Sequence, residues 1–244
     1  GAAQASYGAP YYWTNLSDAI EFVATCPFGM NAMEQNAWCY YGGGIEEADK
    51  IYNALGLKFL PMGNTGNQMG GWFNKEINTP DDYKGLKMRM PGLGGRTIEK
   101  LGATPVLLAG PDVLPSLASG AVDAAEWICP AADLGAGLYQ AAKFYYGPGW
   151  HEPSTLLDLS IDLNAWESLD SATQGLVTNM TQSFNMTVFS RFQAINGPAL
   201  QKLVGEHGVT IKTFPDEVLI ALGNAAGEVV SERGSINSET KAIA

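Results

Sequence analysis

Cysteine is scarce in this chain, and its spacing excludes the sites that cysteine usually builds. The sequence has three cysteines, Cys26, Cys39 and Cys129. They form no C-x-x-C pair, so neither a zinc knuckle nor a disulfide-stapled scaffold is predicted. We interpret all three as small hydrophobic side chains of a folded core, with one oxidised pair as the alternative.

Positive charge is scarce as well: 14 Lys and Arg stand against 25 Asp and Glu, for a net charge of -11. No cluster of basic residues is present, which excludes the electrostatic footprint of a nucleic-acid-binding protein. The sequence also lacks an apolar run of the roughly 20 residues that a membrane-spanning helix needs. A small anion stays a candidate ligand, because one buried arginine dominates its surroundings while distant surface charges are screened over about 10 Å.

The chain does have enough apolar sequence to fold, since 46% of its 244 residues are hydrophobic. Strand and helix patterns alternate and are separated by short links that contain glycine. Strands are expected at residues 57–62, 86–90, 104–108, 121–127, 156–164 and 209–213. Helices are expected at residues 45–55, 94–101, 111–118, from 168 to about 205 with a bend at Gly197-Pro198, and from 215 to 231–234. This order predicts an α/β fold with mainly parallel βαβ units and long helices, and such sheets bind ligands at the carboxyl ends of strands.

Arg89 is the most informative residue of the sequence. Apolar residues alternate with polar ones from Leu86 to Met90, which predicts a half-buried strand with Arg89 near its end. A guanidinium in such a place needs an anion, and its planar fork matches a carboxylate with two parallel hydrogen bonds. The pattern allows two anions: the carboxylate of a bound ligand, or an internal Asp or Glu.

Gln68, Glu126 and Trp127 would form a cation site if the sheet brings them to the same cleft. They offer an amide oxygen, two carboxylate oxygens and a backbone carbonyl. Hard cations prefer such an all-oxygen set, and a single carboxylate favours Na⁺, or Ca²⁺ with further help. A 2-oxo or 2-hydroxy acid would complete the shell while its carboxylate lies on Arg89. Taken singly, the same residues are compatible with a turn amide, a strand-end carboxylate and a core indole.

Tyr12 and Glu152 are further candidates for contact with the ligand. His151 and Glu152 follow an aromatic-rich segment, residues 144–150, that we interpret as a turn. A cleft position would make Glu152 a ligand or a neighbour of one. Tyr12 belongs to the aromatic-rich first forty residues, which is typical of a core or a cleft wall. Three glycines at residues 42–44 lack the lysine and the spacing of phosphate-binding loops, so no nucleotide site is predicted.

Six motifs carry a family likeness through most of the chain. They are YYW (11–13), PFG (27–29), WCYYGGG (38–44), YKGLKMRMPG (83–92), GAVDAAEW (120–127) and GWHEP (149–153). Together they resemble the solute-binding proteins of tripartite ATP-independent periplasmic (TRAP) transporters, and most of all the branch that binds 2-oxo acids such as pyruvate with Na⁺, or lactate with Ca²⁺. In that branch the motif arginine, here Arg89, binds the substrate carboxylate. The cation is held by groups that match the Gln68 and Glu126 side chains and the Trp127 carbonyl.

The resemblance also implies a periplasmic-binding-protein-like fold of two lobes, joined by crossing strands near residues 67 and 154. Residues 1–66 plus 155–195 would form lobe I, and residues 67–154 plus 196–244 would form lobe II. Family members begin with a strand-helix-strand portion of lobe I and end with a further long helix, so this chain is expected to be truncated at both ends. A homodimer is expected only where that C-terminal helix is present.

The function implied by the resemblance is that of a periplasmic receptor and not of an enzyme. It would close over a small 2-oxo monocarboxylate together with Na⁺, or alternatively Ca²⁺, and deliver the acid to the membrane subunits of the transporter. Two alternatives stay open. One is a metal-dependent lyase or aldolase acting on 2-oxo acids, with Glu126 or His151 as base, although the chain has only two histidines. The other is a sensory ligand-binding domain of similar architecture.

Overall fold

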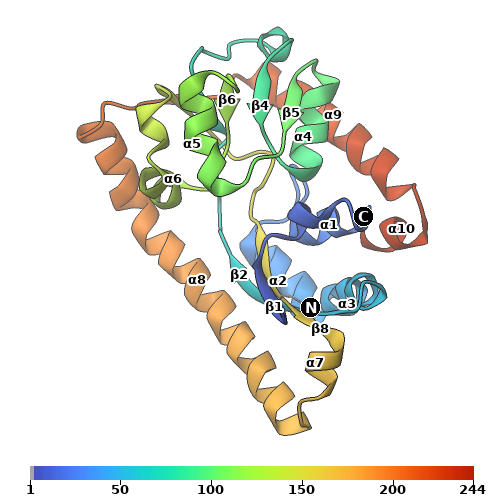
Figure 1. Cartoon of the computed structure of the whole chain (residues 1–244). Coiled ribbons are helices and arrows are strands. Elements are labelled where there is room, and N and C mark those ends of the chain that lie inside the picture. The colour runs from blue at the N-terminus through green and yellow to red at the C-terminus, as the bar shows by residue number, and fades with distance from the viewer. Residues whose placement is uncertain (1–2) are drawn as a thin grey trace.

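The computed structural model describes residues 3–244, and the strands of this part form two sheets (Figure 1). The three-stranded sheet has the order β1 (Ala5–Gly8), β8 (Leu156–Asp162), β2 (Leu57–Asn64). The six-stranded sheet has the order β5 (Thr104–Val106), β4 (Lys87–Arg89), β6 (Ala124–Ala125), β3 (Gly71–Phe73), β7 (Phe144–Gly147), β9 (Thr210–Thr213). Helices pack around each sheet, which gives the two-lobed α/β architecture that the family resemblance implies.

The helices confirm the stronger patterns of the sequence. In chain order they are α1 (Ile20–Ala24), α2 (Ala32–Tyr41), α3 (Gly44–Ala54), α4 (Gly92–Lys100), α5 (Gly110–Ser119), α6 (Pro130–Ala136), α7 (Leu163–Glu167), α8 (Ser171–Gly205), α9 (Asp216–Gly234) and α10 (Ser238–Ile243), with a 3₁₀ turn η1 at Pro10–Trp13. The predictions at α3, α4, α5, α8 and α9 are confirmed, whereas α1, α2, α6, α7 and α10 are not anticipated. Within residues 3–244, no helix combines the length and the apolar character that crossing a membrane requires.

Parallel pairing is confined to the six-stranded sheet. There β4 runs parallel to β5 and β6, and β7 runs parallel to β9, whereas β3 is antiparallel to both of its neighbours. The predicted βαβ units are confirmed where α4 connects β4 to β5 and α5 connects β5 to β6. The three-stranded sheet is antiparallel, because β8 lies between β1 and β2 and runs opposite to both.

The turn predicted at residues 144–150 is wrong over its first part, because residues 144–147 form β7. The aromatic side chains of β7 alternate between the two faces of the sheet. Tyr145 stacks on Trp72 with ring centroids 4.1 Å apart, and Tyr146 packs edge-on against Phe73 at 5.2 Å. This period of two is a strand pattern, but the Pro and Gly residues that follow it directly are typical of a turn and obscure it.

The core is divided among clusters that belong to the two lobes. Buried side chains on the two faces of the six-stranded sheet form separate clusters, and another cluster lies under α3 and β2. Cys39 belongs to that last cluster, and burial raises the pKa of its thiol to about 12. The three cysteines are free. Cys39 and Cys129 are buried as predicted, and Cys26 is half-buried.

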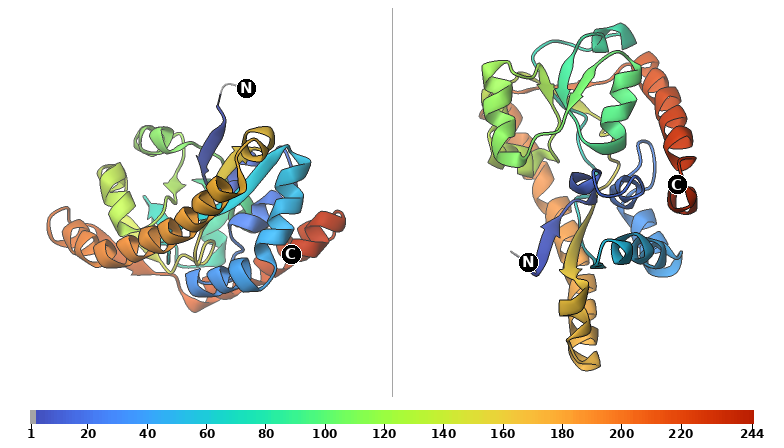
Figure 2. Two further views of the ribbon diagram at one scale, coloured as in Figure 1. Left: turned by 90° about the horizontal axis from the view of Figure 1, so that it is seen from below. Right: turned by 45° about the vertical axis from the view of Figure 1, so that its right-hand side comes forward.

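The helix α8 is 35 residues long and passes beside both sheets (Figures 1 and 2). Its buried Asn185 donates from Nδ2 to Asn36 Oδ1 of α2 at 2.8 Å. Further along, the Asn196 side chain accepts a hydrogen bond from the backbone N–H of Ala131 in α6 at 3.2 Å. The helix continues through Pro198. α8 is therefore fastened to elements of both lobes.

Two chain segments cross between the sheets and lie next to each other. One leads from β2 to β3 and the other from β7 to β8. They are joined where the backbone N–H of Thr65 donates to the Thr155 carbonyl and the backbone N–H of Thr155 donates to Thr65 Oγ1, both at 3.1 Å. The predicted residue boundaries of the two lobes stay a prediction.

Candidate functional site

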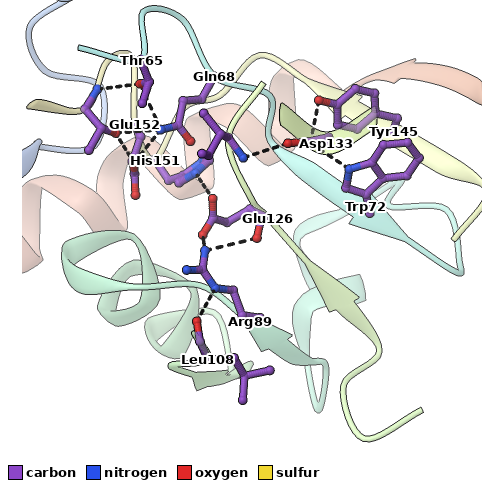
Figure 3. Close-up of polar contacts among 12 residues, drawn as sticks. Thr65, Gln68, Trp72, Arg89, Leu108, Glu126, Asp133, Tyr145, His151 and Glu152 are labelled. Atoms are coloured by element: carbon purple, nitrogen blue, oxygen red, sulfur yellow. Dashed lines mark hydrogen bonds and ion pairs between the residues drawn. The ribbon is translucent and has the colours of Figure 1, made fainter. Parts of the chain in front are cut away.

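Four of the candidate residues, Gln68, Arg89, Glu126 and Glu152, lie close together (Figure 3). Arg89 is the last residue of β4, and Glu126 directly follows β6. Because β4 and β6 are parallel, with Arg89 opposite Ala125, both side chains leave the same edge of the sheet. Gln68 and Glu152 come from the two crossing segments. The site is therefore built from the carboxyl ends of two strands and from both connections between the lobes.

Arg89 is fully buried, and acceptors surround its guanidinium. Nε donates to the Leu108 carbonyl at 3.3 Å and Nη2 donates to the Tyr12 hydroxyl at 3.0 Å. Nη1 donates to the Glu126 carboxylate and, at 3.2 Å, to the Glu126 carbonyl. The Trp127 indole lies over the guanidinium, with 5.1 Å from Cζ to the ring centroid. Of the two anions that the sequence allows for Arg89, this structure pairs it with the internal one.

His151 holds the other oxygen of the Glu126 carboxylate. The Nε2 of His151 lies 3.2 Å from Glu126 Oε2, and the ring is fully buried. Burial is the main reason that the pKa of His151 is lowered to about 4, so the ring is neutral near neutral pH. A neutral ring beside a carboxylate carries its proton at that nitrogen and donates it. Nδ1 is left as an acceptor, and no group in the described part of the chain donates to it.

Gln68 is oriented by a polar network between the two crossing segments. Its Nε2 donates to Glu152 Oε2 at 2.8 Å, to Thr155 Oγ1 at 2.7 Å and to Thr65 Oγ1 at 3.2 Å. The amide nitrogen faces these acceptors, so the amide oxygen faces away from them. Gln68 Oε1 is buried and has no hydrogen-bond partner among residues 3–244. An unsatisfied buried carbonyl costs roughly 1–3 kcal/mol, which marks this oxygen as a position where a bound group would be stabilised.

The donor atoms at the centre of the site suit a hard cation. Ligand atoms of Glu126, His151 and Glu152 all lie within 4.8 Å of one another, and all three residues are buried. Together with Gln68 Oε1 they form a set dominated by oxygen, which Na⁺ and Ca²⁺ prefer. Gln68 and Glu126, two of the three cation ligands that the sequence predicts, fit this chemistry. The third, the backbone carbonyl of Trp127, stays a prediction.

The structure brings the predicted contact residues close together, with Tyr12 and Trp127 half-buried and the other four buried. These residues are Tyr12, Gln68, Arg89, Glu126, Trp127 and Glu152. Arg89 contacts three of them directly, and Gln68 contacts Glu152. Their roles as ligands of a substrate or a cation stay predictions.

Reasoning from the sequence does not single out three neighbours of this cluster. Tyr11 is buried, and its pKa is raised well above the ordinary value by burial and then by the nearby Glu152 carboxylate. The YYW motif contains Tyr11 and is the signal by which it could have been found. Thr65 and Thr155 carry no such signal, since only the pairing of two distant segments brings their hydroxyls to Gln68.

The fold and the site are those of an extracellular solute-binding protein. The chain matches the DctP family, bacterial extracellular solute-binding protein family 7, over residues 1–235, and it belongs to that family. The monocarboxylate 2-oxoacid-binding periplasmic protein of Nostoc sp. strain PCC 7120 is 39% identical over 243 residues. That match covers 100% of this chain and 66% of the relative, so the chain spans less than two thirds of the relative's length.

Two solved structures share the fold closely. One is a TRAP periplasmic solute-binding protein of Pseudoalteromonas atlantica T6c with bound sodium and pyruvate, which is 40% identical with a TM-score of 0.96. The other comes from Colwellia psychrerythraea, has bound calcium and pyruvate, and is 39% identical with a TM-score of 0.95. Each match covers 100% of this chain and 74% of the other chain.

Proposed function

We propose that this chain is the binding part of a periplasmic TRAP receptor for a small 2-oxo monocarboxylate such as pyruvate, bound together with a hard cation and delivered to the membrane subunits. The observation that carries the proposal is a fully buried Arg89 guanidinium in one site with a buried Gln68 oxygen that lacks a partner among residues 3–244. The guanidinium fork suits the carboxylate of the acid, and the amide oxygen suits the cation. The family and the pyruvate complexes of the related proteins support this assignment.

Each residue of the site has a distinct part in binding. Arg89 would take the carboxylate of the acid in exchange for that of Glu126, which frees Glu126 for the cation. A bound cation would offset the carboxylate charges and bind the second oxygen of the acid. His151 holds Glu126 through Nε2, and the Trp127 ring over the guanidinium excludes water, which strengthens the charged hydrogen bonds.

The charges of the site determine which acids it rejects. In the described part of the chain, Arg89 is the cationic side chain of the site, whereas Glu126 and Glu152 are buried carboxylates. A second carboxylate on the ligand would lose its water without gaining a positive partner, and it would lie near like charges. Dicarboxylates such as succinate are therefore expected to bind weakly.

The remaining expectations follow from the family. A family of solute-binding proteins disfavours the lyase or aldolase alternative, and we expect no turnover of pyruvate in the presence of Mg²⁺ or Mn²⁺. A sensory role would use the same site, so the ligand does not separate it from transport. A homodimer formed through a further C-terminal helix stays a prediction.

Thermal unfolding of the purified chain tests the proposal. Pyruvate, 2-oxobutyrate, lactate and succinate would each be added in Na⁺, Ca²⁺ and choline buffers. A ligand at about 100 times its Kd adds near 2.7 kcal/mol to the free energy of unfolding, so a true ligand raises the Tm visibly. We expect the 2-oxo acids to raise the Tm in Na⁺ or Ca²⁺ and succinate to leave it unchanged. A folded sample that no 2-oxo acid stabilises in any buffer would contradict the proposal.

A further inference from the structure

Glu152 is a buried carboxylate that accepts hydrogen bonds from neutral donors. It is 2% exposed, and its Oε2 accepts from Gln68 Nε2 at 2.8 Å and from Thr155 Oγ1. The ion pairs formed by residues 3–244 include Arg89 with Glu126 but none with Glu152. The fold therefore places a second negative charge beside Glu126 without supplying a second positive one.

The charges of the site can be counted side chain by side chain. Arg89 contributes one guanidinium, and Glu126 and Glu152 contribute two buried carboxylates. The net charge of these side chains is -1, and a bound monocarboxylate changes the net charge of the site to -2. A monovalent cation would leave one negative charge uncompensated in a buried site, whereas a divalent cation would leave none. Burial of an uncompensated charge is strongly unfavourable.

We propose that Glu152 sets the cation preference of the site and makes it select a divalent hard cation of the Ca²⁺ kind over Na⁺ when the acid is bound. The inference rests on the proposed function, because the bound acid is part of the charge count. The expectation of Na⁺ from the sequence assumes a single carboxylate, and Glu152 is the further charge that Ca²⁺ needs. Ca²⁺ sites in general tune their affinity by the number of charged ligands.

Two features of the structure support a direct effect of Glu152 on the cation. Its ligand atom lies within 4.8 Å of those of Glu126 and His151. It also accepts the hydrogen bond that turns the Gln68 amide nitrogen toward the crossing segments, so it contributes to aiming Gln68 Oε1 at the site. Groups that form hydrogen bonds to metal ligands orient these ligands and change the affinity for the metal in many proteins.

The variant Glu152→Gln tests the charge with little change of shape. Its amide oxygen accepts hydrogen bonds from Gln68 and Thr155 as the carboxylate does. Isothermal titration calorimetry would measure the affinity for pyruvate of both proteins in choline buffer with added CaCl₂ or NaCl. We expect the wild type to bind pyruvate roughly tenfold or more tightly in Ca²⁺ than in Na⁺. We expect Glu152→Gln to lose most of this ratio through weaker binding in Ca²⁺.

A matched control separates the local charge from net charge. Glu206→Gln removes the same charge at the exposed C-terminal end of α8 and should leave the ratio unchanged. Titration of CaCl₂ or NaCl without pyruvate, followed by tryptophan fluorescence, gives a second readout. Without the acid the site needs a single positive charge, so the preference for Ca²⁺ should appear only when pyruvate is present.

Several outcomes would overturn the inference. One is an equal Ca²⁺-to-Na⁺ ratio in the wild type and in Glu152→Gln, and another is a preference for Ca²⁺ that is as strong without pyruvate. A wild type that binds pyruvate at least as tightly in Na⁺ overturns it without any variant, which covers the case that Glu152→Gln does not fold. Failure of the proposed function looks different, because pyruvate would then bind to a folded wild type in neither salt, and both conclusions would fall together.

Discussion

Asp133 and Glu126 are both buried carboxylates near the six-stranded sheet, but the fold surrounds them differently (Figure 3). Asp133 lies on α6 and accepts hydrogen bonds from the backbone N–H of Ile128 at 3.0 Å, from Trp72 Nε1 at 2.9 Å and from the Tyr145 hydroxyl at 2.7 Å. Its network is closed by groups of the protein itself. Asp133 therefore has the surroundings of a structural carboxylate.

The network around Glu126 ends on atoms without partners. In the described chain, neither Gln68 Oε1 nor His151 Nδ1 has a hydrogen-bond partner, although both are buried. Glu152 adds a charge that no internal cation compensates. The difference shows that burial alone does not mark a functional carboxylate. A functional carboxylate is distinguished by neighbouring groups that lack a hydrogen-bond partner or a compensating charge, which a bound ligand would supply.

The largest expected effect on stability is that of Asp133→Ala. The substitution leaves Trp72 Nε1 and the Tyr145 hydroxyl buried without an acceptor, and each unsatisfied group costs about 1–3 kcal/mol. Urea unfolding should show the free energy of unfolding reduced by roughly 2–6 kcal/mol. The affinity of the remaining folded protein for pyruvate should stay the same. A stable variant that no longer binds pyruvate would place Asp133 in the functional site.

Arg89→Lys should have the converse effect. Lysine keeps the charge but lacks the planar fork, so the affinity for pyruvate should fall by about 2 kcal/mol or more, which is roughly 30-fold. The loss of stability without ligand should be smaller than that of Asp133→Ala. Calorimetry and thermal unfolding measure the two quantities separately. Unchanged affinity for pyruvate would mean that Arg89 has only a structural role, as the ion-pair partner of Glu126.

Asp133 should also make stability depend on pH. Burial raises the pKa of Asp133 from 3.8 to about 6, so between these values the folded state holds a proton that the unfolded state has lost. This contribution to stability is complete below the unfolded pKa and is lost as the pH rises through the folded pKa. Urea unfolding across this window should show the wild type losing stability relative to Asp133→Asn. A difference between the two proteins that does not change with pH would contradict this prediction.

Tyr12→Phe should have the smallest effect. It removes the hydroxyl that accepts from Arg89 Nη2 at 3.0 Å, so one hydrogen bond that positions the guanidinium is lost. The affinity for pyruvate should fall by about 0.5–1.5 kcal/mol, roughly two- to tenfold. Tyr41→Phe is the matched control, because Tyr41 is 95% exposed, and its affinity should equal that of the wild type. Equal affinities in both variants would exclude a role for the Tyr12 hydroxyl.

Local patterns in the sequence predict the part of the site that lies on the six-stranded sheet. Arg89 ends β4 and Glu126 directly follows the parallel neighbour β6. Alternating strand and helix patterns with glycine-containing links are enough to predict that such residues lie at the same edge of a sheet. The bonding of Gln68 and Glu152 depends on two segments that meet across the molecule, and no local pattern encodes that meeting. The antiparallel sheet escapes prediction for the same reason, since β8 pairs with strands far away in the sequence. The family resemblance implies Gln68 as a cation ligand, whereas Glu152 is a candidate because it follows an aromatic-rich segment.

The helix α8 connects the two lobes as a single rigid element that is hydrogen-bonded to both. At about 1.5 Å per residue it is roughly 50 Å long. Asn185 forms its hydrogen bond with α2, and Asn196 forms its hydrogen bond with α6. Any rotation of one lobe against the other must bend α8 or break one of these two hydrogen bonds. Pro198 cannot donate a backbone hydrogen bond, so α8 bends most easily in the turn that contains this residue. A change in the angle between the lobes would therefore be expected to bend α8 in this turn first.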